Sequence, residues 1–557
     1  MERRVILAIL LMLIIAVLPS ILFPPKKTPV RPTVGRPDSS ATPPVAAGES
    51  SGAPVRLSER PTVRPSGASA ETVWVTSPLY RLGFTTQGGA LVSAALLDYK
   101  SFTPVDSEHP VQLVPPDRPM LVFARTAGSD TTALGSWRLT PSAKQITVGP
   151  EGASLTFRGE HSGAEVALEY RFFPDEYRVS VRGRMEGFGQ TGGTLLLGLG
   201  DGLRTVEADT MDDYRHFAVV TKAAKTQSLA LQSLNPGERK ILDGPFEWAG
   251  VKSKYFFTAA LAIEENAPRF GAALVEGGPR TVTASSMFGH SAVATRAVLT
   301  LTLPVPPAGD FGFDLYVGPL EYRRLAKLGH DLDDANPYGG VLRPLIQPVS
   351  VLVVNILIWM HDRLTLAYGW VLIIFGVLVR ALLWPLNQRA MESSIRMQAV
   401  APLMKQMQDR YKNDPERLQK EMMRLYKEHN VNPLGGCLPM LLPMPVLFAL
   451  FFVFANTIEF RGVPFLWLTD LSRADPYYII PIVMGLSMFV LSKVGQIGVP
   501  PNPQAKMMVY FMPVFMTVLF LRFASGLNLY YAVSNLFSIP QQYLIAKRRL
   551  REQAGKT

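Results

Sequence analysis

The sequence has almost no cysteine: Cys437 is the only one among 557 residues. An intrachain disulfide is therefore excluded, and so is a zinc site built from several cysteines and histidines. Cys437 lies far from the N-terminus, which also excludes an N-terminal lipoprotein anchor. His-Glu-x-x-His metalloprotease motifs and Walker loops are absent as well. We therefore expect a protein that is not an enzyme and that binds no cofactor.

Acidic residues are outnumbered, with 45 Asp and Glu against 56 Lys and Arg, and the net charge is +11. The basic residues gather in particular loops rather than along one stripe, so the pattern does not indicate a DNA-binding protein. Beside a membrane, such a surface more economically indicates anionic lipid or ribosomal RNA as a neighbour.

The first 70 residues contain no pattern of a folded domain. Residues 1–23 hold an apolar run that is long enough to span a bilayer, which predicts an N-terminal transmembrane anchor. A cleaved signal peptide is the alternative, although no Ala-x-Ala site directly follows the run. Residues 24–70 contain ten prolines and little aromatic content, which predicts a disordered linker.

Residues 71–330 alternate apolar and polar side chains in short runs that are separated by Gly, Pro and Asp. The run from Glu165 to Phe173 is an example. Period-two alternation predicts strands with one buried face, and turns at this spacing are typical of an antiparallel sandwich. We expect one all-β domain.

Residues 341–546 carry most of the long apolar runs. The first half of 341–360 contains Arg343 and Pro348, which predicts an amphipathic helix along the membrane interface. Five predicted spans follow, at about 364–386, 437–458, 477–494, 507–522 and 527–545. With the anchor, the fold class is a six-helix membrane bundle plus a β sandwich.

Lysine and arginine counts predict the orientation. The loop 387–436 contains nine basic residues, the loop 459–476 contains two, and the tail 547–557 is basic. We therefore expect both termini and the loop 387–436 in the cytoplasm of a bacterial inner-membrane protein, with the β domain in the periplasm. Lys26, Lys27 and Arg31 contradict this orientation locally, because they follow the first span on its expected periplasmic side. The orientation still holds, because the span at 364–386 must separate the β domain from the basic loop.

The loop 387–436 has a helical pattern of its own. Leu418, Met422 and Leu425 recur at helical spacing, and Asp414-Pro415 predicts a helix start with an aspartate cap. A second amphipathic pattern precedes Asn413, so we expect a cytoplasmic hairpin of two helices. Packing of these helices on each other is the simpler explanation for most of their apolar positions.

Arg380 is the only charged residue between Leu366 and Leu386. A guanidinium keeps its proton, and its burial at a bilayer centre costs from about 3 to more than 10 kcal/mol. Either Arg380 snorkels toward Asn387, or water and negative groups reach it inside the membrane. In the last span, a polar helical face favours the second interpretation, although interhelical hydrogen bonding is an alternative. Its members are Asn528, Tyr531, Asn535, Ser538 and Gln542.

Several motifs resemble the YidC/Oxa/Alb family of membrane protein insertases. They are Val379-Arg380, Asn432-Pro-Leu-Gly-Gly-Cys-Leu-Pro439, Asp475-Pro-Tyr-Tyr-Ile-Ile-Pro481 and Ser525-Gly-Leu-Asn-Leu-Tyr-Tyr531. The segments Thr86-Gln-Gly-Gly-Ala-Leu91, Trp248-Ala-Gly-Val-Lys252 and Tyr316-Val-Gly-Pro319 resemble the periplasmic domain of the Gram-negative members. The resemblance covers roughly residues 75–545.

This resemblance implies a five-helix core with a hydrophilic groove that is open to cytoplasm and lipid. It implies that Arg380 lines the substrate groove, to which the polar face of the last span adds Asn528, Tyr531 and Asn535. It also implies a slide for the substrate helix along Met444, Leu447 and Tyr530. Gly376 departs from relatives that carry a hydroxyl there, so the groove would be less polar at this point.

The implied function is that of an insertase and chaperone for newly made inner-membrane proteins. The expected partners are those nascent proteins, the Sec translocon, the lipid bilayer, and the ribosome through the hairpin and the basic tail. Two rivals from other classes remain. A solute transporter would favour internal repeats and paired ionisable groups, neither of which we find. A glycan-binding envelope protein would use the helices only as anchors.

Overall fold

The computed structural model describes residues 70–554 except 104–105, 108, 117, 129, 189–191, 263–267, 283–291, 337, 339–341, 412–413, 430–443 and 499–502. The predicted anchor at 1–23 and residues 24–69 of the linker lie outside the described residues, as do Cys437 and the motif at 432–439.

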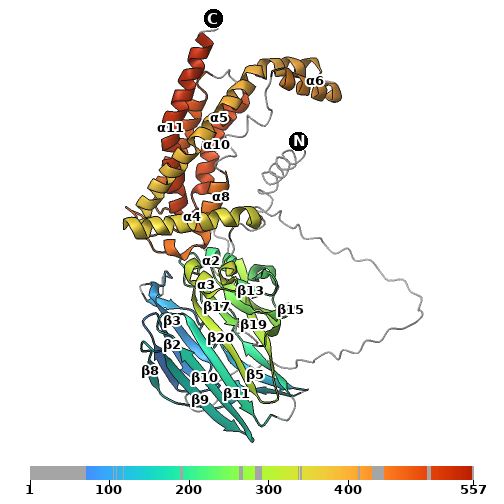
Figure 1. The fold of residues 1–557 in the computed structure, drawn as a ribbon, viewed down its shortest axis with the longest axis vertical. Coiled ribbons are helices and arrows are strands. Elements are labelled where there is room, and N and C mark those ends of the chain that lie inside the picture. The colour runs from blue at the N-terminus through green and yellow to red at the C-terminus, as the bar shows by residue number, and fades with distance from the viewer. Residues whose placement is uncertain are drawn as a thin grey trace, which may run out of the picture. The chain divides into compact units, whose positions relative to one another are not determined.

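Residues 72–319 form a large all-β domain of three sheets, which confirms the predicted β class (Figure 1). Every strand pair is antiparallel except β1 with β8, which run parallel. The nine-stranded sheet has the order β14 (Thr226–Ala230), β13 (Ala218–Lys222), β16 (Trp248–Lys252), β17 (Phe256–Leu261), β20 (Asp310–Pro319), β11 (Arg178–Glu186), β10 (Ala164–Phe172), β9 (Ala153–His161) and β7 (Thr140–Pro141).

Two smaller sheets complete the domain. The five-stranded sheet has the order β4 (Pro110–Gln112), β3 (Leu91–Lys100), β2 (Tyr80–Thr85), β1 (Thr72–Thr76) and β8 (Gln145–Thr147). The six-stranded sheet has the order β15 (Arg239–Phe246), β18 (Phe270–Val282), β19 (Ala292–Val305), β12 (Gly193–Gly198), β5 (Val122–Ala127) and β6 (Asp130–Ala133). Short helices η1 (Leu134–Ser136), η2 (Leu231–Ser233) and α2 (Thr210–His216) lie between strands.

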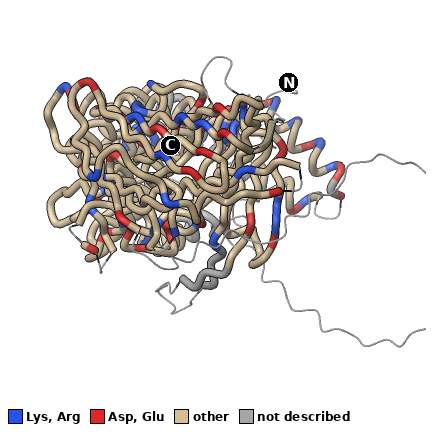
Figure 2. The backbone as a smooth tube through the Cα atoms, turned by 90° about the horizontal axis from the view of Figure 1, so that it is seen from below, with Lys and Arg blue, Asp and Glu red and all other residues tan. Residues whose placement is uncertain are grey.

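Aromatic side chains join the two small sheets to the large one. Phe84 in β2 lies with its ring centroid 4.7 Å from that of Tyr170 in β10. Phe123 in β5 lies 6.4 Å from Phe313 in β20 by the same measure. All four rings are buried, so the core lies between the large sheet and its two partners. Charged residues of both signs are scattered over the chain in the view of Figure 2, without a stripe of one sign.

The rest of the described chain is helical. Helices α3 (Tyr322–Leu328) and η3 (Leu332–Ala335) lead from the β domain to α4 (Arg343–Leu364). The remaining helices are α5 (Tyr368–Arg410), α6 (Pro415–Glu428), α8 (Met444–Asn456), η6 (Ile458–Phe460), α9 (Ile479–Gly495), α10 (Pro503–Phe520) and α11 (Ser525–Ala554).

Two of these helices are long and apolar enough to cross a membrane, namely α4 with 22 residues and Tyr368–Pro385 within α5 with 18 residues. Met444–Asn456, Ile479–Gly495 and Val509–Phe520 are apolar but shorter. Helices α8, α9, α10 and α11 overlap the four later predicted spans, and residues 437–443 of the first of those lie outside the described part. The interfacial helix predicted for the first half of 341–360 is one continuous helix to Leu364, with Pro348 inside it.

The hairpin that was predicted for 387–436 differs from the prediction in its first half. Its upstream helix is the continuation of α5, which runs unbroken from the predicted span to Arg410. The second helix starts as predicted, because Asp414 accepts a hydrogen bond from the Arg417 N–H and Pro415 is the first helical residue. Between Leu386 and Arg410 the chain has no glycine and a single proline, Pro402, and the helix continues through it instead of ending after the predicted span.

Residues 457–476 connect α8 to α9 and contact the starts of two other helices. The ring of Phe465 lies against Gly369 in the first turn of α5. The carbonyl of Leu471 accepts a hydrogen bond from the N–H of Gly526 at the start of α11, at 3.0 Å. We call residues 457–476 the connecting loop.

We expect Gly369→Ala to destabilise the contact between α5 and the connecting loop. An added Cβ would lie 2.0 Å from the Phe465 ring, so the ring must move, and overpacking of this kind costs about 1–3 kcal/mol. Gly376→Ala in the same helix is the matched control, because its Cβ would lie 3.4 Å from the Tyr530 ring, an ordinary contact. Thermal unfolding should separate the two variants; equal midpoints would contradict the expectation.

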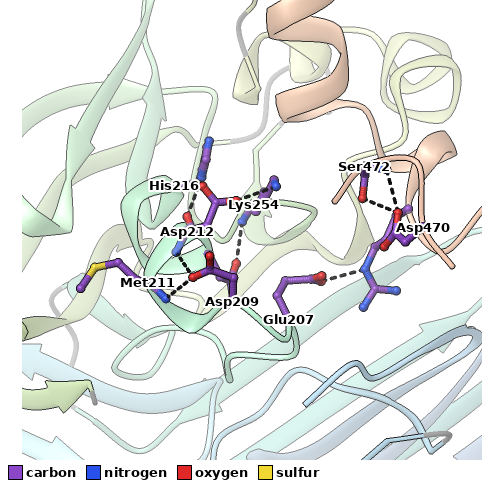
Figure 3. A network of polar contacts seen from close by, with 10 residues as sticks. Glu207, Asp209, Met211, Asp212, His216, Lys254, Asp470 and Ser472 are labelled. Atoms are coloured by element: carbon purple, nitrogen blue, oxygen red, sulfur yellow. Dashed lines mark hydrogen bonds and ion pairs between the residues drawn. The ribbon is translucent and has the colours of Figure 1, made fainter. Parts of the chain in front are cut away.

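Asp213 in α2 is a buried carboxylate, next in sequence to Asp212, which is labelled in the polar network of Figure 3. Its Oδ1 accepts a hydrogen bond from the Lys254 N–H at 3.2 Å, and its Oδ2 has no hydrogen-bond partner among the described residues. Burial, followed by the negative charge of Glu207, raises the pKa of Asp213 to about 7. The folded protein therefore holds a proton on Asp213 more tightly than the unfolded chain does.

We expect Asp213→Asn to stabilise the protein more at pH 8 than at pH 5. Asp213 contributes fully to stability below its unfolded pKa of roughly 4, and that contribution is lost as the pH rises through about 7. Asparagine cannot ionise, so its advantage grows by at most about 1.4 kcal/mol per pH unit. Unfolding midpoints of the full chain at both pH values measure this. Asp212→Asn is the control, since Asp212 is paired with Lys254 at 2.7 Å; an advantage for Asp213→Asn that is equal at both pH values would refute the assignment.

Candidate functional site

Helices α5 and α11 lie side by side and run in the same direction. The Nε of Arg380 donates a hydrogen bond to the Oγ of Ser534 at 2.6 Å. Seven residues further along both helices, the Nδ2 of Asn387 donates to the Oε1 of Gln541 at 3.2 Å. Both contacts join residues 154 positions apart. A constant offset over about two helical turns means parallel packing with a fixed register.

Helix α9 runs parallel to α11 as well. The Nδ2 of Asn535 donates to the Oγ of Ser487 at 3.3 Å. Further along both helices, the Nη1 of Arg549 donates to the carbonyl of Gly495 at 3.1 Å. The second contact lies later in both helices, so α5, α9 and α11 share one direction.

Helix α10 runs the opposite way against α9. A Cβ on Gly485 would lie 1.8 Å from the Oγ1 of Thr517, so the two backbones approach closely there. Lys493, later in α9, donates to the hydroxyl of Tyr510, which comes earlier in α10. A chain that crosses a membrane repeatedly must reverse its direction from one span to the next, and α9 and α10 are related in this way.

Arg380 is half-buried on the face of α5 that meets α11. Among the described residues it forms no ion pair with a carboxylate, and its recorded partner is the neutral Ser534. Tyr530 and Tyr531 precede Ser534 by about one turn of α11, on the same side of the helix. The guanidinium therefore meets a hydroxyl group, which can solvate a cation without neutralising it.

The other residues predicted for the groove lie in different contacts. The ring of Tyr531 lies 5.3 Å from that of Phe520, and Asn535 meets Ser487. Asn528 is fully buried, and its Nδ2 donates to the Phe520 carbonyl at 3.0 Å, one of the carbonyls left free at the end of α10. The structure thus places Tyr531 and Asn528 at the end of α10 and Asn535 against α9.

The residues predicted for the slide divide in the same way. Tyr530 is buried, with its ring 6.1 Å from that of Phe375 in α5. Met444 is the first residue of α8 and is half-buried. Leu447, one turn later, packs against the hydrophobic core of the helical part. Of the three, Tyr530 is the one on the face of α11 that meets α5, since its ring lies 3.4 Å from the Cβ position of Gly376, one turn before Arg380.

Sequence reasoning missed Ser534, Gln541 and Asn387. Their signal was present, because Arg380 and Asn387 are seven residues apart in one helix and Ser534 and Gln541 are seven apart in another. Matching heptad spacings of polar residues in two apolar helices indicate a shared face. The periodicity of the last span by itself predicted the helix face of Asn528, Tyr531 and Asn535, which is next to the face that carries Ser534 and Gln541.

Two family models match the chain. The family described as "YidC periplasmic domain" matches residues 72–352, and the family described as "60Kd inner membrane protein" matches residues 359–553. A protein named "Membrane protein insertase YidC" from Syntrophus aciditrophicus is 32% identical over 486 residues, which are 86% of this chain and 85% of that protein. The chain belongs to the YidC family of membrane protein insertases.

Other YidC relatives match over nearly the full length. The YidC insertase of Oleidesulfovibrio alaskensis is 30% identical over 574 residues, 98% of this chain and 99% of that protein. A solved structure described as "Active YidC insertase crystal structure with the first transmembrane domain resolved" is 17% identical, with a TM-score of 0.34 over 86% of this chain and 93% of that one. The two family models and the two relatives confirm the predicted family, and with it an inner-membrane protein with a periplasmic-type domain.

Proposed function

We propose that this YidC family member inserts newly made proteins into the bacterial inner membrane and helps them fold, alone or beside the Sec translocon. The observation that carries the proposal is the similarity to YidC insertases over almost the whole chain. No cofactor and no catalytic step is needed, because an apolar segment gains free energy by leaving water for lipid. The difficult part is the passage of its polar flank.

A hydrophilic groove between the helices would ease that passage. Arg380 supports it, because a half-buried cation solvated by a hydroxyl group is costly in hydrocarbon and useful to an acidic flank. We assign Arg380, Tyr531, Asn535 and Asn528 to the groove, with Asn528 holding the end of α10 beside it. Met444, Leu447 and Tyr530 would form the slide for the incoming helix.

The helix directions support the proposed topology. Helices α5, α9 and α11 are the first, third and fifth of the core and run parallel, as spans of an odd order must. Their later ends would face the cytoplasm, which places both the hairpin and the C-terminus there and the β domain in the periplasm. Exposed aromatic residues support it as well, since such residues are enriched at membrane interfaces: Trp370, Trp467 and Tyr477 lie toward one end of these helices, and Tyr510 and Tyr543 toward the other.

Basic residues on the cytoplasmic side support contact with the ribosome and with anionic lipid. In α6, Arg417, Lys420 and Arg424 are exposed. The exposed residues of the α11 end include Lys547, Arg548 and Arg551. We propose that the hairpin and this tail meet ribosomal RNA while a nascent chain is delivered.

Depletion of the protein tests the proposal directly. Small, newly made membrane proteins should then stay accessible to protease from the wrong side, and reconstituted protein in liposomes should restore their insertion. Loss of a solute flux with insertion intact would favour a transporter. A defect confined to the envelope polysaccharide would favour a glycan-binding protein.

A further inference from the structure

The connecting loop meets the β domain at a buried ion pair. The Nε of Arg461 donates to the Oε1 of Glu207 at 2.7 Å, across 254 positions of sequence. The dashed line that leaves Glu207 in Figure 3 marks this contact. The two side chains are only 2% and 10% exposed. This buried pair is therefore part of a packed contact between the connecting loop and the β domain.

The pocket around Arg461 is made by the β domain. The guanidinium carbon lies 4.2 Å from the ring centroid of Phe102 and 5.4 Å from that of Phe256. The N–H of Phe102 donates to the carbonyl of Val206 at 2.8 Å, so the stacking ring and the carboxylate are held by adjacent segments. Cation–π contacts of a desolvated guanidinium add to the ionic contact and orient its plane.

Beyond Arg461, the same loop holds the starts of two core helices. The carbonyl of Arg473 accepts a hydrogen bond from the N–H of Ser525 at 2.7 Å, at the first residue of α11. The carboxylate of Asp475 accepts from the N–H groups of Tyr477 at 3.0 Å and Ile480 at 2.8 Å, at the start of α9. The position of the loop therefore sets where α9 and α11 begin.

A buried ion pair is poorly explained by stability alone. Burial raises the pKa of Glu207 and Arg461 lowers it, with a net rise, so desolvation makes the ionised carboxylate less favourable. Buried pairs often add little net stability, whereas removal of one partner leaves an uncompensated charge. Such a pair instead favours one arrangement of the β domain and the connecting loop over other arrangements, in which the two charges would be buried without a partner.

We propose that the Glu207–Arg461 pair is a latch through which the β domain positions the connecting loop, and with it the starts of α9 and α11. The proposal stands on the contacts above and does not depend on the proposed function. Glu207 and Arg461 are positioning residues, far along the chain from the contacts around Arg380.

Hydrogen exchange of the full chain in lipid nanodiscs tests the latch. Glu207→Gln changes only the β domain, yet the amides of 461–473 and those of Ser525 and Gly526 should exchange faster, on the order of 100-fold. Amides at 453–457 should stay protected, because a second junction holds them: Asn336 donates to the Asn456 carbonyl at 2.8 Å. Faster exchange confined to the β domain would overturn the proposal.

A double-mutant cycle separates a latch from two independent effects. Arg461→Met should speed exchange as Glu207→Gln does, and Glu207→Gln/Arg461→Met should speed it no further than either single change, because the contact is lost once and no buried charge is left unpaired; multiplied effects would overturn the proposal. Arg323→Gln is the matched control, since the Arg323–Asp362 pair has a similar length of 2.9 Å but its side chains are 46% and 52% exposed. An exposed pair of this kind should leave exchange in the loop unchanged.

Discussion

Replacement of Arg380 by alanine should lower the insertion of substrates with an acidic flank by about tenfold or more, without lowering the amount of protein. Replacement by lysine should retain much of the activity. The reason is that Arg380 is a half-buried cation that meets a hydroxyl group and, among the described residues, no carboxylate. An attractor of this kind acts through its charge, which lysine also carries, rather than through the planar fork of the guanidinium.

The measurement is insertion into liposomes of substrates that differ only in the charge of the translocated flank. Arg363→Ala is the control, because Arg363 is an exposed arginine in the last turn of α4. Ser534→Ala tests the partner: it removes the 2.6 Å hydrogen bond but keeps the charge, so its effect should be much smaller than that of Arg380→Ala.

Snorkelling of Arg380 predicts the opposite result. A side chain that only escapes from lipid would leave an alanine variant fully active, since its removal relieves a cost. Labelling adds an independent measurement: Arg380→Cys in a Cys437→Ser background should react with a water-soluble thiol reagent added from the cytoplasmic side. A stable, active and unreactive set of variants would rule out the groove mechanism.

Deletion of the cytoplasmic hairpin, 391–430, should abolish insertion while the protein stays in the membrane. The hairpin is a built structure, because Val400 in α5 and Leu425 in α6 are buried and the Tyr426 hydroxyl meets the sulfur of Met404 at 3.9 Å. Its exposed basic residues suit an anionic partner. A mere connector would need neither the buried contacts nor the charge.

The deletion should start after residue 390 and be closed by a short Gly/Ser linker, because α5 is continuous and its membrane part must keep its end. Pulldown of ribosomes and protease mapping of the membrane part accompany the insertion assay. Leu425→Ala, which loosens the hairpin, should fall between the deletion and Lys420→Ala, a single exposed charge. A deletion variant with full activity would leave packing as the only role of the hairpin.

Local patterns of the chain predicted its local structure well. Alternation in 165–173 predicted β10, whose buried positions Val166, Leu168, Tyr170 and Phe172 follow period two. The Asp414-Pro415 start is confirmed in atomic detail. The predicted span at 477–494 and the observed α9 agree within about two residues at each end. In each case the signal lies within a few neighbouring residues, where side-chain periodicity and capping chemistry act.

Contacts between distant residues were beyond the reach of the sequence. Periodicity placed the polar face of α11 at Asn528, Tyr531 and Asn535, but it did not reveal that Ser534 would meet Arg380. No local pattern connects Glu207 with Arg461. Such pairs are chosen by how whole sheets and helices fit together, and many registers satisfy the same hydrophobic pattern.

The sequence by itself determined the class of this protein: an all-β domain joined to apolar helices, one unpaired arginine among them, and motifs sufficient to place the chain in its family. Tertiary structure alone decided the register of α5 on α11, the end of α10 as the partner of Asn528, and the buried pair that joins the β domain to the connecting loop. The physical reason is that composition and period act on the nearest neighbours along the chain, whereas a register or a buried ion pair exists only after packing has excluded water from both partners.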